Sequence, residues 1–241
     1  MTASVKSTLL ANDPDERDVP GPRIRPRDAA TLILVKHDGG EPKVLMGMRA
    51  AGMAFMPNRF VFPGGRIDPG DQRIVPASDL KPSVLQKLAI GITASRARGL
   101  ALAAIRETFE ETGNLVGEHR DQTPRTRSPA WQRFFAHGIV PRLDALHYIA
   151  RAITPPQRPR RFDARFFLAR ADAIAHTLEA AENEELLQSQ WLTLAQARAL
   201  DIPAITRRIL EEVEVRVREP DADRAIPFFR FTRNRPQLTF L

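Results

Sequence analysis

Two short segments of the sequence carry residues suited to holding a metal ion and a phosphate chain. Residues 62–71 read FPGGRIDPGD, and residues 106–113 read RETFEETG. The three glutamates of the second segment supply the oxygen ligands that Mg²⁺ prefers, and paired glycines let a phosphate approach the backbone closely. Together the segments indicate a site for metal-assisted hydrolysis of a diphosphate.

The acids of the second segment share one face of the helix that the pattern predicts. At 3.6 residues per turn, Glu111 lies about 40° from Glu107 and Glu110 about 60° on the other side. Leu102 and Phe109 fall on the opposite face, which suits a core. Like charges at this spacing cost roughly 0.2–0.5 kcal/mol per pair, and a bound divalent cation would reverse that cost. A solvated acidic face explains the helix equally well on its own, and the glycine segment favours the metal site.

The composition restricts the kinds of site that are available. The 241 residues include no cysteine, so disulfides, thiolate zinc sites and cysteine nucleophiles are excluded. The net charge is 36 − 29 = +7, with only five lysines among the basic residues. Arginine binds phosphate in a bidentate manner, but the arginines are dispersed, which favours a compositional bias over a dedicated anion surface. Since no apolar run is long enough to span a bilayer, we expect a cytoplasmic protein without membrane or nucleic-acid partners.

The periodicity of apolar residues predicts an α/β protein. Strands and helices interleave without a regular βαβ rhythm, which favours a mixed sheet with helices on both faces. We expect residues 1–27 to form a mobile arm and residues 28–241 a single domain. The predicted strands cover 28–36, 43–49, 59–62, 146–153 and 162–169, with a short one at 191–192 and an extended tail at 226–241. The predicted helices cover 81–94, 98–112, 131–136, 194–200 and 202–214, and residues 118–129 are expected to form a surface loop.

The two segments resemble the signature of the Nudix hydrolases. That signature is a glycine, five residues, an acid, seven residues and then Arg-Glu-x-x-Glu-Glu-x-Gly followed by an apolar residue. Gly65 is the glycine, and Asp71 stands where the family usually has glutamate. Thirty-four residues separate Asp71 from Arg106, so 34 − 7 = 27 residues are inserted, at about residues 72–97. Asn114 takes the place of the usual apolar residue.

The resemblance implies a fold and a set of roles. The fold is an α/β/α sandwich with a mixed sheet and a helical insertion inside the signature. Glu107 and Glu111 would bind Mg²⁺ or Mn²⁺ together with the carbonyl of Gly64. Glu110 would be a third ligand or would hold the attacking water, and Arg106 would orient the acids.

Many Nudix enzymes use a further glutamate, outside the signature, as a base or ligand. Glu182, Glu184 and Glu185 lie where such a residue could come. A charged loop is the simpler explanation of each one, and Glu185 is the candidate that we carry forward.

A longer resemblance bears on the substrate. Residues 45–65 and 161–168 are similar to the Nudix branch that contains the peroxisomal coenzyme A diphosphatases. Gly64, Gly65 and Arg49 are the candidate substrate-binding residues, although the second arginine of the coenzyme A signature is missing after Arg49. The expected partner is a small-molecule diphosphate, coenzyme A or acyl-coenzyme A. Nucleotide sugars or dinucleotides are the alternative, and a ligand-binding module without turnover is a third reading. The family resemblance also makes a homodimer an expectation.

Overall fold

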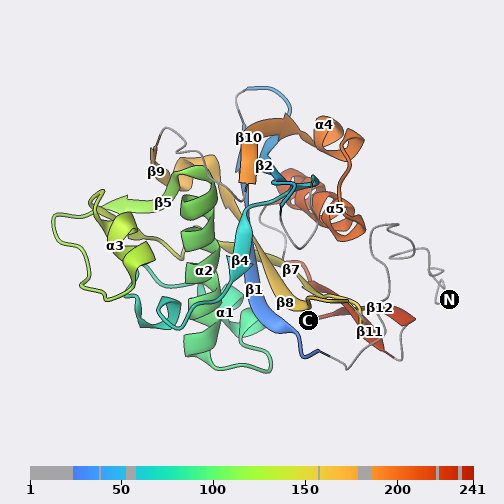
Figure 1. Cartoon of the computed structure of the whole chain (residues 1–241), viewed down its shortest axis with the longest axis horizontal. Coiled ribbons are helices and arrows are strands. Elements are labelled where there is room, and N and C mark those ends of the chain that lie inside the picture. The colour runs from blue at the N-terminus through green and yellow to red at the C-terminus, as the bar shows by residue number, and fades with distance from the viewer. Residues whose placement is uncertain are drawn as a thin grey trace.

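The fold of this computed structural model is a mixed sheet between two layers of helices (Figure 1). The structure describes residues 24–37, 39–52, 58–156, 158–178, 186–220, 223–232 and 235–241. Within these residues, nine strands form the main sheet, in the order β10-β2-β1-β8-β7-β11-β12, with β3 beside β2 and β4 beside β1. The strands are β1 (Arg27–Lys36), β2 (Lys43–Arg49), β3 (Phe60–Val61), β4 (Gly64–Arg66), β7 (His147–Ile153), β8 (Phe162–Arg170), β10 (Leu186–Thr193), β11 (Pro227–Thr232) and β12 (Arg235–Phe240).

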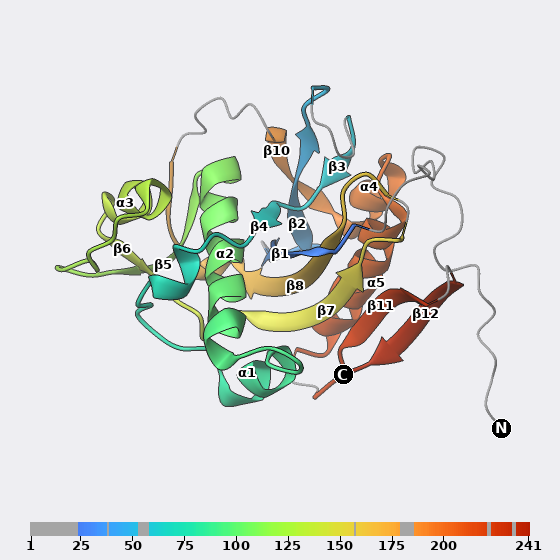
Figure 2. The ribbon, with the colours of Figure 1, turned by 60° about the horizontal axis from the view of Figure 1, so that its bottom comes forward.

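The central strand β1 is buried on both faces, which defines the two helical layers. Leu32 and Leu34 belong to the core on the side of α2, whereas Ile33 and Val35 belong to the core on the side of α5. This near-continuous apolar run is typical of a strand covered on both sides, and Figure 2 shows the two layers. The predicted sandwich is therefore confirmed. The helices are α1 (Pro82–Leu88), α2 (Ala94–Thr112), α3 (Pro129–Phe135), α4 (Leu194–Ala199) and α5 (Ala204–Arg218).

The helix that carries the acids begins earlier than the sequence pattern predicted. It starts at Ala94 rather than at residue 98, because the side chain of Thr93 accepts a hydrogen bond from the backbone N–H of Arg96 at 3.2 Å. Such an N-cap satisfies a backbone donor that would otherwise lack a partner. The predicted end is confirmed, since Gly113 follows the helix with a φ of 71°. The inserted residues are therefore divided between a short helix, α1, and the first turns of α2.

A second, smaller sheet follows α2 and was not predicted. Its order is β6-β5-β9 in the part of the chain that the structure describes. The prediction that a loop begins at residue 118 is therefore wrong, because β5 continues to His119. Asn114, the polar departure from the Nudix signature, is buried and accepts a hydrogen bond from Thr177 at 2.9 Å. The strands are β5 (Asn114–His119), β6 (Ile139–Pro141) and β9 (Ile174–Thr177), and the 3₁₀ turns are η1 (Asp71–Arg73) and η2 (Ala171–Ala173).

Both ends of the described chain contribute to the main sheet. The predicted tail forms the hairpin β11–β12, and β11 extends the sheet by pairing with β7. Residues 24–27 belong to the described fold, because Arg27 lies in β1 and the carbonyl of Ile24 accepts a hydrogen bond from Arg161 at 2.7 Å; the rest of the expected arm lies outside the described residues. Among the described residues, none of the helices has the length and hydropathy needed to cross a membrane.

Replacing Gly113 with alanine should destabilise the protein. Its φ of 71° is unfavourable for other residues, and a Cβ would lie 2.9 Å from the carbonyl oxygen of Leu178. The left-handed conformation alone costs about 1–2 kcal/mol, and the collision adds to that cost. Gly91→Ala is the matched control, because Gly91 has a φ of 78° and nothing within 4 Å of a Cβ. Chemical denaturation should give a larger loss for Gly113→Ala, and equal losses would contradict the collision.

Candidate active site

A buried ion pair joins the two halves of the signature. Arg106 of α2 donates from Nε to Asp71 Oδ1 at 2.9 Å and from Nη2 to Asp71 Oδ2 at 3.1 Å. Its Nη2 also donates to the carbonyl of Arg66 at 2.9 Å. Although burial favours the neutral guanidinium, the hydrogen bonds to Asp71 and the charge of Glu107 hold the pKa of Arg106 above its ordinary value. The glycine segment and the acidic helix are thereby fixed to one another despite the insertion between them.

Asp71 has further partners that explain its complete burial. It accepts from the indole Nε1 of Trp131 at 2.8 Å and from the backbone N–H of Asp68 at 2.7 Å. Its exposed fraction is 0%. Asp71 therefore serves as the acceptor that positions Arg106 and the loop after β4, and it is too enclosed to reach a ligand. The sequence analysis matched Asp71 to the acidic position of the signature but did not predict a role for it.

Glu107 lies directly against the glycine pair. A Cβ on Gly65 would sit 2.4 Å from Glu107 Cδ, so only glycine allows this approach. Burial raises the pKa of Glu107 to about 6, against the lowering effect of Arg106, whose Nη1 donates to Glu107 Oε1 at 2.9 Å. A carboxylate that is costly to ionise in this way would gain from a nearby cation.

Glu111 meets the neighbouring glycine. Its Oε2 accepts from the backbone N–H of Gly64 at 2.9 Å, and its exposed fraction is only 6%. Glu107 and Glu111 thus converge on two successive residues of β4. The sequence predicted this convergence of the glycine segment with these two acids, and the structure brings them together.

Glu110 is placed differently. Its Oε2 accepts from Arg106 at 2.7 Å and its Oε1 from Arg133 at 2.8 Å, so arginines engage both oxygens. Within the described residues, no three acidic or histidine side chains stand ready as a metal cluster. The four-ligand set of Glu107, Glu110, Glu111 and Gly64 is therefore not assembled in this structure, because Arg106 and Arg133 hold Glu110.

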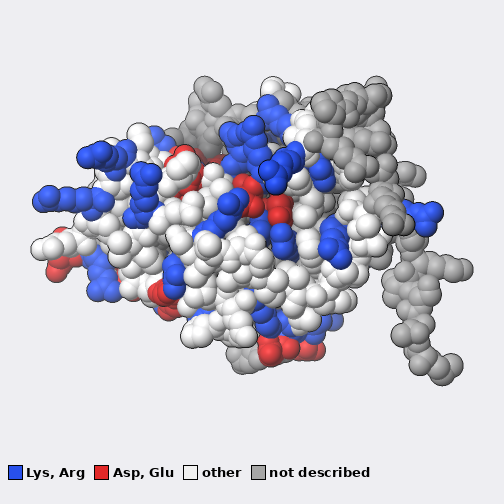
Figure 3. Space-filling view, turned by 90° about the horizontal axis from the view of Figure 1, so that it is seen from below, with Lys and Arg blue, Asp and Glu red and all other residues white. Residues whose placement is uncertain are grey.

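A large cavity of about 1400 Å³ opens beside these residues. Gly64, Gly65, Arg106, Glu107 and Glu110 are part of its lining. Basic side chains gather around a few acidic ones on this face of the molecule (Figure 3). The carboxylates of α2 thus reach the cavity past a strand segment that lacks side chains.

The rest of the cavity comes from the sheet and from α5. Phe166, Phe229 and Ile205 are apolar residues of the lining. Arg49, a predicted substrate-binding residue, also lines the cavity, and its Nε is buried without a hydrogen-bond partner among the described residues. A substrate with a charged part and an apolar part would match both kinds of lining residue.

The inserted residues and the predicted base contribute little to the described site. Of the inserted residues 72–97, Arg96 is the one that lines the cavity among the described residues. The insertion also packs under α2, where Leu88 is buried in the core. Glu185, with Glu182 and Glu184, lies outside the described residues.

One solved structure supports the fold, and two others match the chain more distantly. A NUDIX hydrolase from Alicyclobacillus acidocaldarius matches the chain with a TM-score of 0.60 at 26% sequence identity, over 78% of this chain and 90% of that one. The chain has the Nudix hydrolase fold. The NUDIX domain of Shewanella oneidensis NrtR, complexed with ADP ribose, matches with a TM-score of 0.47 at 12% identity, over 86% of this chain and 94% of that one. A MutT NUDIX hydrolase from Burkholderia pseudomallei matches with a TM-score of 0.45 at 18% identity, over 79% of this chain and 99% of that one.

No family model matches the chain, and no curated protein matches it either. The inserted residues depart from the fixed spacing of the Nudix signature. The agreement between the fold and the complete segment 106–113 supports a Nudix-type hydrolase.

Asp71→Ala should be strongly destabilising. It leaves the buried guanidinium of Arg106 without its bidentate partner, and breaking a buried ion pair in this way typically costs about 3–5 kcal/mol. The control is Asp172→Ala, which removes a surface pair with Arg170 whose side chains are 68% and 69% exposed and should cost less than about 1 kcal/mol. Urea denaturation measures both. A small loss for Asp71→Ala would show that the ion pair does not join the two halves of the signature.

Proposed function

We propose that this protein is a metal-dependent diphosphatase that acts on nucleotide derivatives. The observation that carries the proposal is the convergence of Glu107 and Glu111 on Gly64 and Gly65 at the edge of the cavity. Two carboxylates and nearby backbone oxygens form a hard-oxygen donor set that suits Mg²⁺ or Mn²⁺. The geometry thus fits the metal site that the Nudix signature implies.

In this proposal Glu107, Glu111 and the carbonyl of Gly64 hold the metal. When bound, the metal would polarise the diphosphate as a Lewis acid and lower the pKa of the attacking water. Water attacks one phosphorus, the bridging P–O bond breaks, and the other phosphate leaves with its substituent. The site residues fix where this happens, because Glu107 and Glu111 are both anchored against β4.

Arg106 and Glu110 have supporting roles in the proposal. Arg106 connects Asp71, Glu107 and Glu110, so it fixes the orientation of the acidic face. Glu110 is the candidate to hold the attacking water or to add a third ligand. It would first have to release Arg133, whose exposed side chain can move away at little cost. Glu185 remains a candidate base on the evidence of the sequence alone.

Coenzyme A or an acyl-coenzyme A is the substrate that the cavity suits best. The acids and arginines of the lining match a nucleotide diphosphate, and Phe166, Phe229 and Ile205 of the same cavity match a pantetheine or acyl arm. Arg49 adds a buried donor without a partner among the described residues. Nucleotide sugars and dinucleotides share the diphosphate but offer no comparable apolar arm.

Activity should require a divalent cation and Glu111. With Mg²⁺ or Mn²⁺, we expect release of adenosine 3′,5′-bisphosphate and phosphopantetheine from coenzyme A, and chelation should abolish it. Glu111→Gln should lower kcat roughly 100-fold, because even outer-shell changes at metal sites cost 10–100-fold. Glu211→Gln, on the exposed face of α5, is the matched control and should retain activity.

Two results would count against the proposal. Undiminished activity of Glu111→Gln on the best substrate would remove the metal assignment. Turnover confined to nucleotide sugars or dinucleotides in a substrate panel would remove coenzyme A while leaving the diphosphatase in place. Metal-independent binding of a nucleotide with no turnover of any diphosphate would favour the non-catalytic module.

A further inference from the structure

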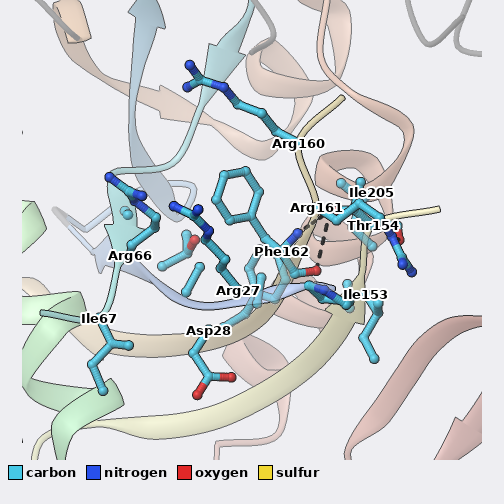
Figure 4. A pocket seen from close by; sticks show the side chains of 18 of the residues that line it. Arg27, Asp28, Arg66, Ile67, Ile153, Thr154, Arg160, Arg161, Phe162 and Ile205 are labelled. Carbon is cyan, nitrogen blue, oxygen red and sulfur yellow. Dashed lines mark hydrogen bonds between the residues drawn. The ribbon is translucent and has the colours of Figure 1, made fainter. Parts of the chain in front are cut away.

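Besides Arg49, three arginines around the cavity have no side-chain partner among the described residues. Arg27 at the start of β1, Arg66 at the end of β4 and Arg160 in the loop before β8 all line it. Among the described residues, their side chains form no hydrogen bond, ion pair or ring contact, whereas most arginines elsewhere on the surface pair with an acid. Figure 4 shows the three side chains around one part of the cavity, with the ring of Phe162 beside Arg27. Three unpaired cations that share a hollow indicate an anionic ligand.

The acids that line the cavity have other partners, and within the described residues none of them forms an ion pair with these three arginines. Asp28 pairs with Arg165 at 2.7 Å and also with Arg96. Asp68 Oδ1 accepts from the backbone N–H of Gly70 at 2.6 Å. Glu107 and Glu110 both accept from Arg106. The hydrogen-bond donors of the three guanidinium groups are thus available to a ligand.

The backbone that carries the three arginines is fixed in advance. The guanidinium of Arg161 donates to the carbonyls of Thr154 at 3.1 Å and Ile24 at 2.7 Å, which ties the loop beside Arg160 to the chain before β1. The backbone N–H of Arg27 donates to the carbonyl of Arg161 at 2.9 Å. The carbonyl of Arg66 is held by Arg106. Such preorganisation lowers the cost of binding a ligand.

Strand register places the arginines beside the acids that are proposed to bind the metal, but not in contact with them. Arg66 pairs with Ala29 across the antiparallel strands β4 and β1, so Arg27 is its diagonal neighbour, at about 7–8 Å between Cα atoms. Gly64, which contacts Glu111, lies two residues before Arg66, about 7 Å along the strand. A diphosphate held at Glu107 and Glu111 would therefore leave the arginines facing the adjoining sugar.

We propose that Arg27, Arg66 and Arg160 bind a phosphomonoester on the sugar of the nucleotide arm, separate from the diphosphate that is cleaved. This inference rests on the proposed diphosphatase function and narrows its substrates. The preferred class is then nucleoside diphosphate derivatives that carry a 2′- or 3′-phosphate. Guanidinium groups suit this ligand because they bind phosphate oxygens through paired, charge-assisted hydrogen bonds.

Substrate pairs that differ by this one phosphate test the proposal. We would measure kcat/KM with Mg²⁺ for coenzyme A against 3′-dephospho-coenzyme A, and for NADPH against NADH. The wild type should prefer the phosphorylated member of at least one pair. Arg66→Gln and Arg160→Gln should each lower that preference about tenfold, the loss expected for one charge-assisted contact. Arg125→Gln removes an exposed arginine outside the cavity and should keep the wild-type ratio.

If the arginine variants lose kcat/KM equally for both members of each pair, the proposal is overturned. The arginines would then not distinguish the substrate that carries the extra phosphate from the one that lacks it. A binding measurement separates this failure from failure of the diphosphatase. In the presence of a chelator, adenosine 3′,5′-bisphosphate should bind about tenfold or more tightly than AMP, and Arg66→Gln should remove the difference. If no diphosphate is hydrolysed but this difference is found, the proposed function fails and the phosphate site stands. If neither nucleotide is preferred, the phosphate site fails regardless of turnover.

Discussion

The buried pair between Asp71 and Arg106 is the contact on which the site depends. It connects the loop after β4 to the middle of α2, and its Asp71 side chain is completely buried from water. Arg106 then distributes its remaining donors to Glu107, Glu110 and the carbonyl of Arg66. One guanidinium therefore positions the acidic face, the strand that faces it and, through Arg66, part of the cavity wall. The 27 additional residues can be accommodated because this contact does not depend on the length of chain between its partners.

The glycines of β4 solve a second geometric problem. The acids extend from a helix on one face of the sheet, whereas the apolar residues of the cavity lining lie on the face that α5 covers. The carboxylates of α2 can reach past β4 only where that strand has no side chain. The contact of Glu107 with Gly65 is too close to admit a Cβ. A strand segment that has backbone but little bulk thus lets the acids of α2 reach the cavity.

Local signals in the sequence were sufficient for the elements that carry the chemistry. The helical spacing of the glutamates, the terminating Gly113 and the apolar run of β1 all reflect interactions within a few residues. Other features depend on contacts between distant segments. The strand character of β4 arises from pairing with β1, and the burial of Asp71 requires Trp131, which lies 60 positions away. The packing of the insertion under α2 likewise depends on tertiary burial of Leu88.

The basic composition is the clearest case in which distribution matters more than amount. A charge of +7 spread along the sequence gives no reason to expect an anion site. In the folded chain many arginines are used in ion pairs, and an arginine with an acid partner contributes little net field to its surroundings. The residues that remain unpaired then decide where the surface is positive. Arg27 and Arg160 are separated by more than half of the chain, and parallel pairing of β1 with β8 brings their segments together. A compositional bias toward arginine can thus supply a phosphate site wherever the fold places several arginines and has already engaged the nearby acids.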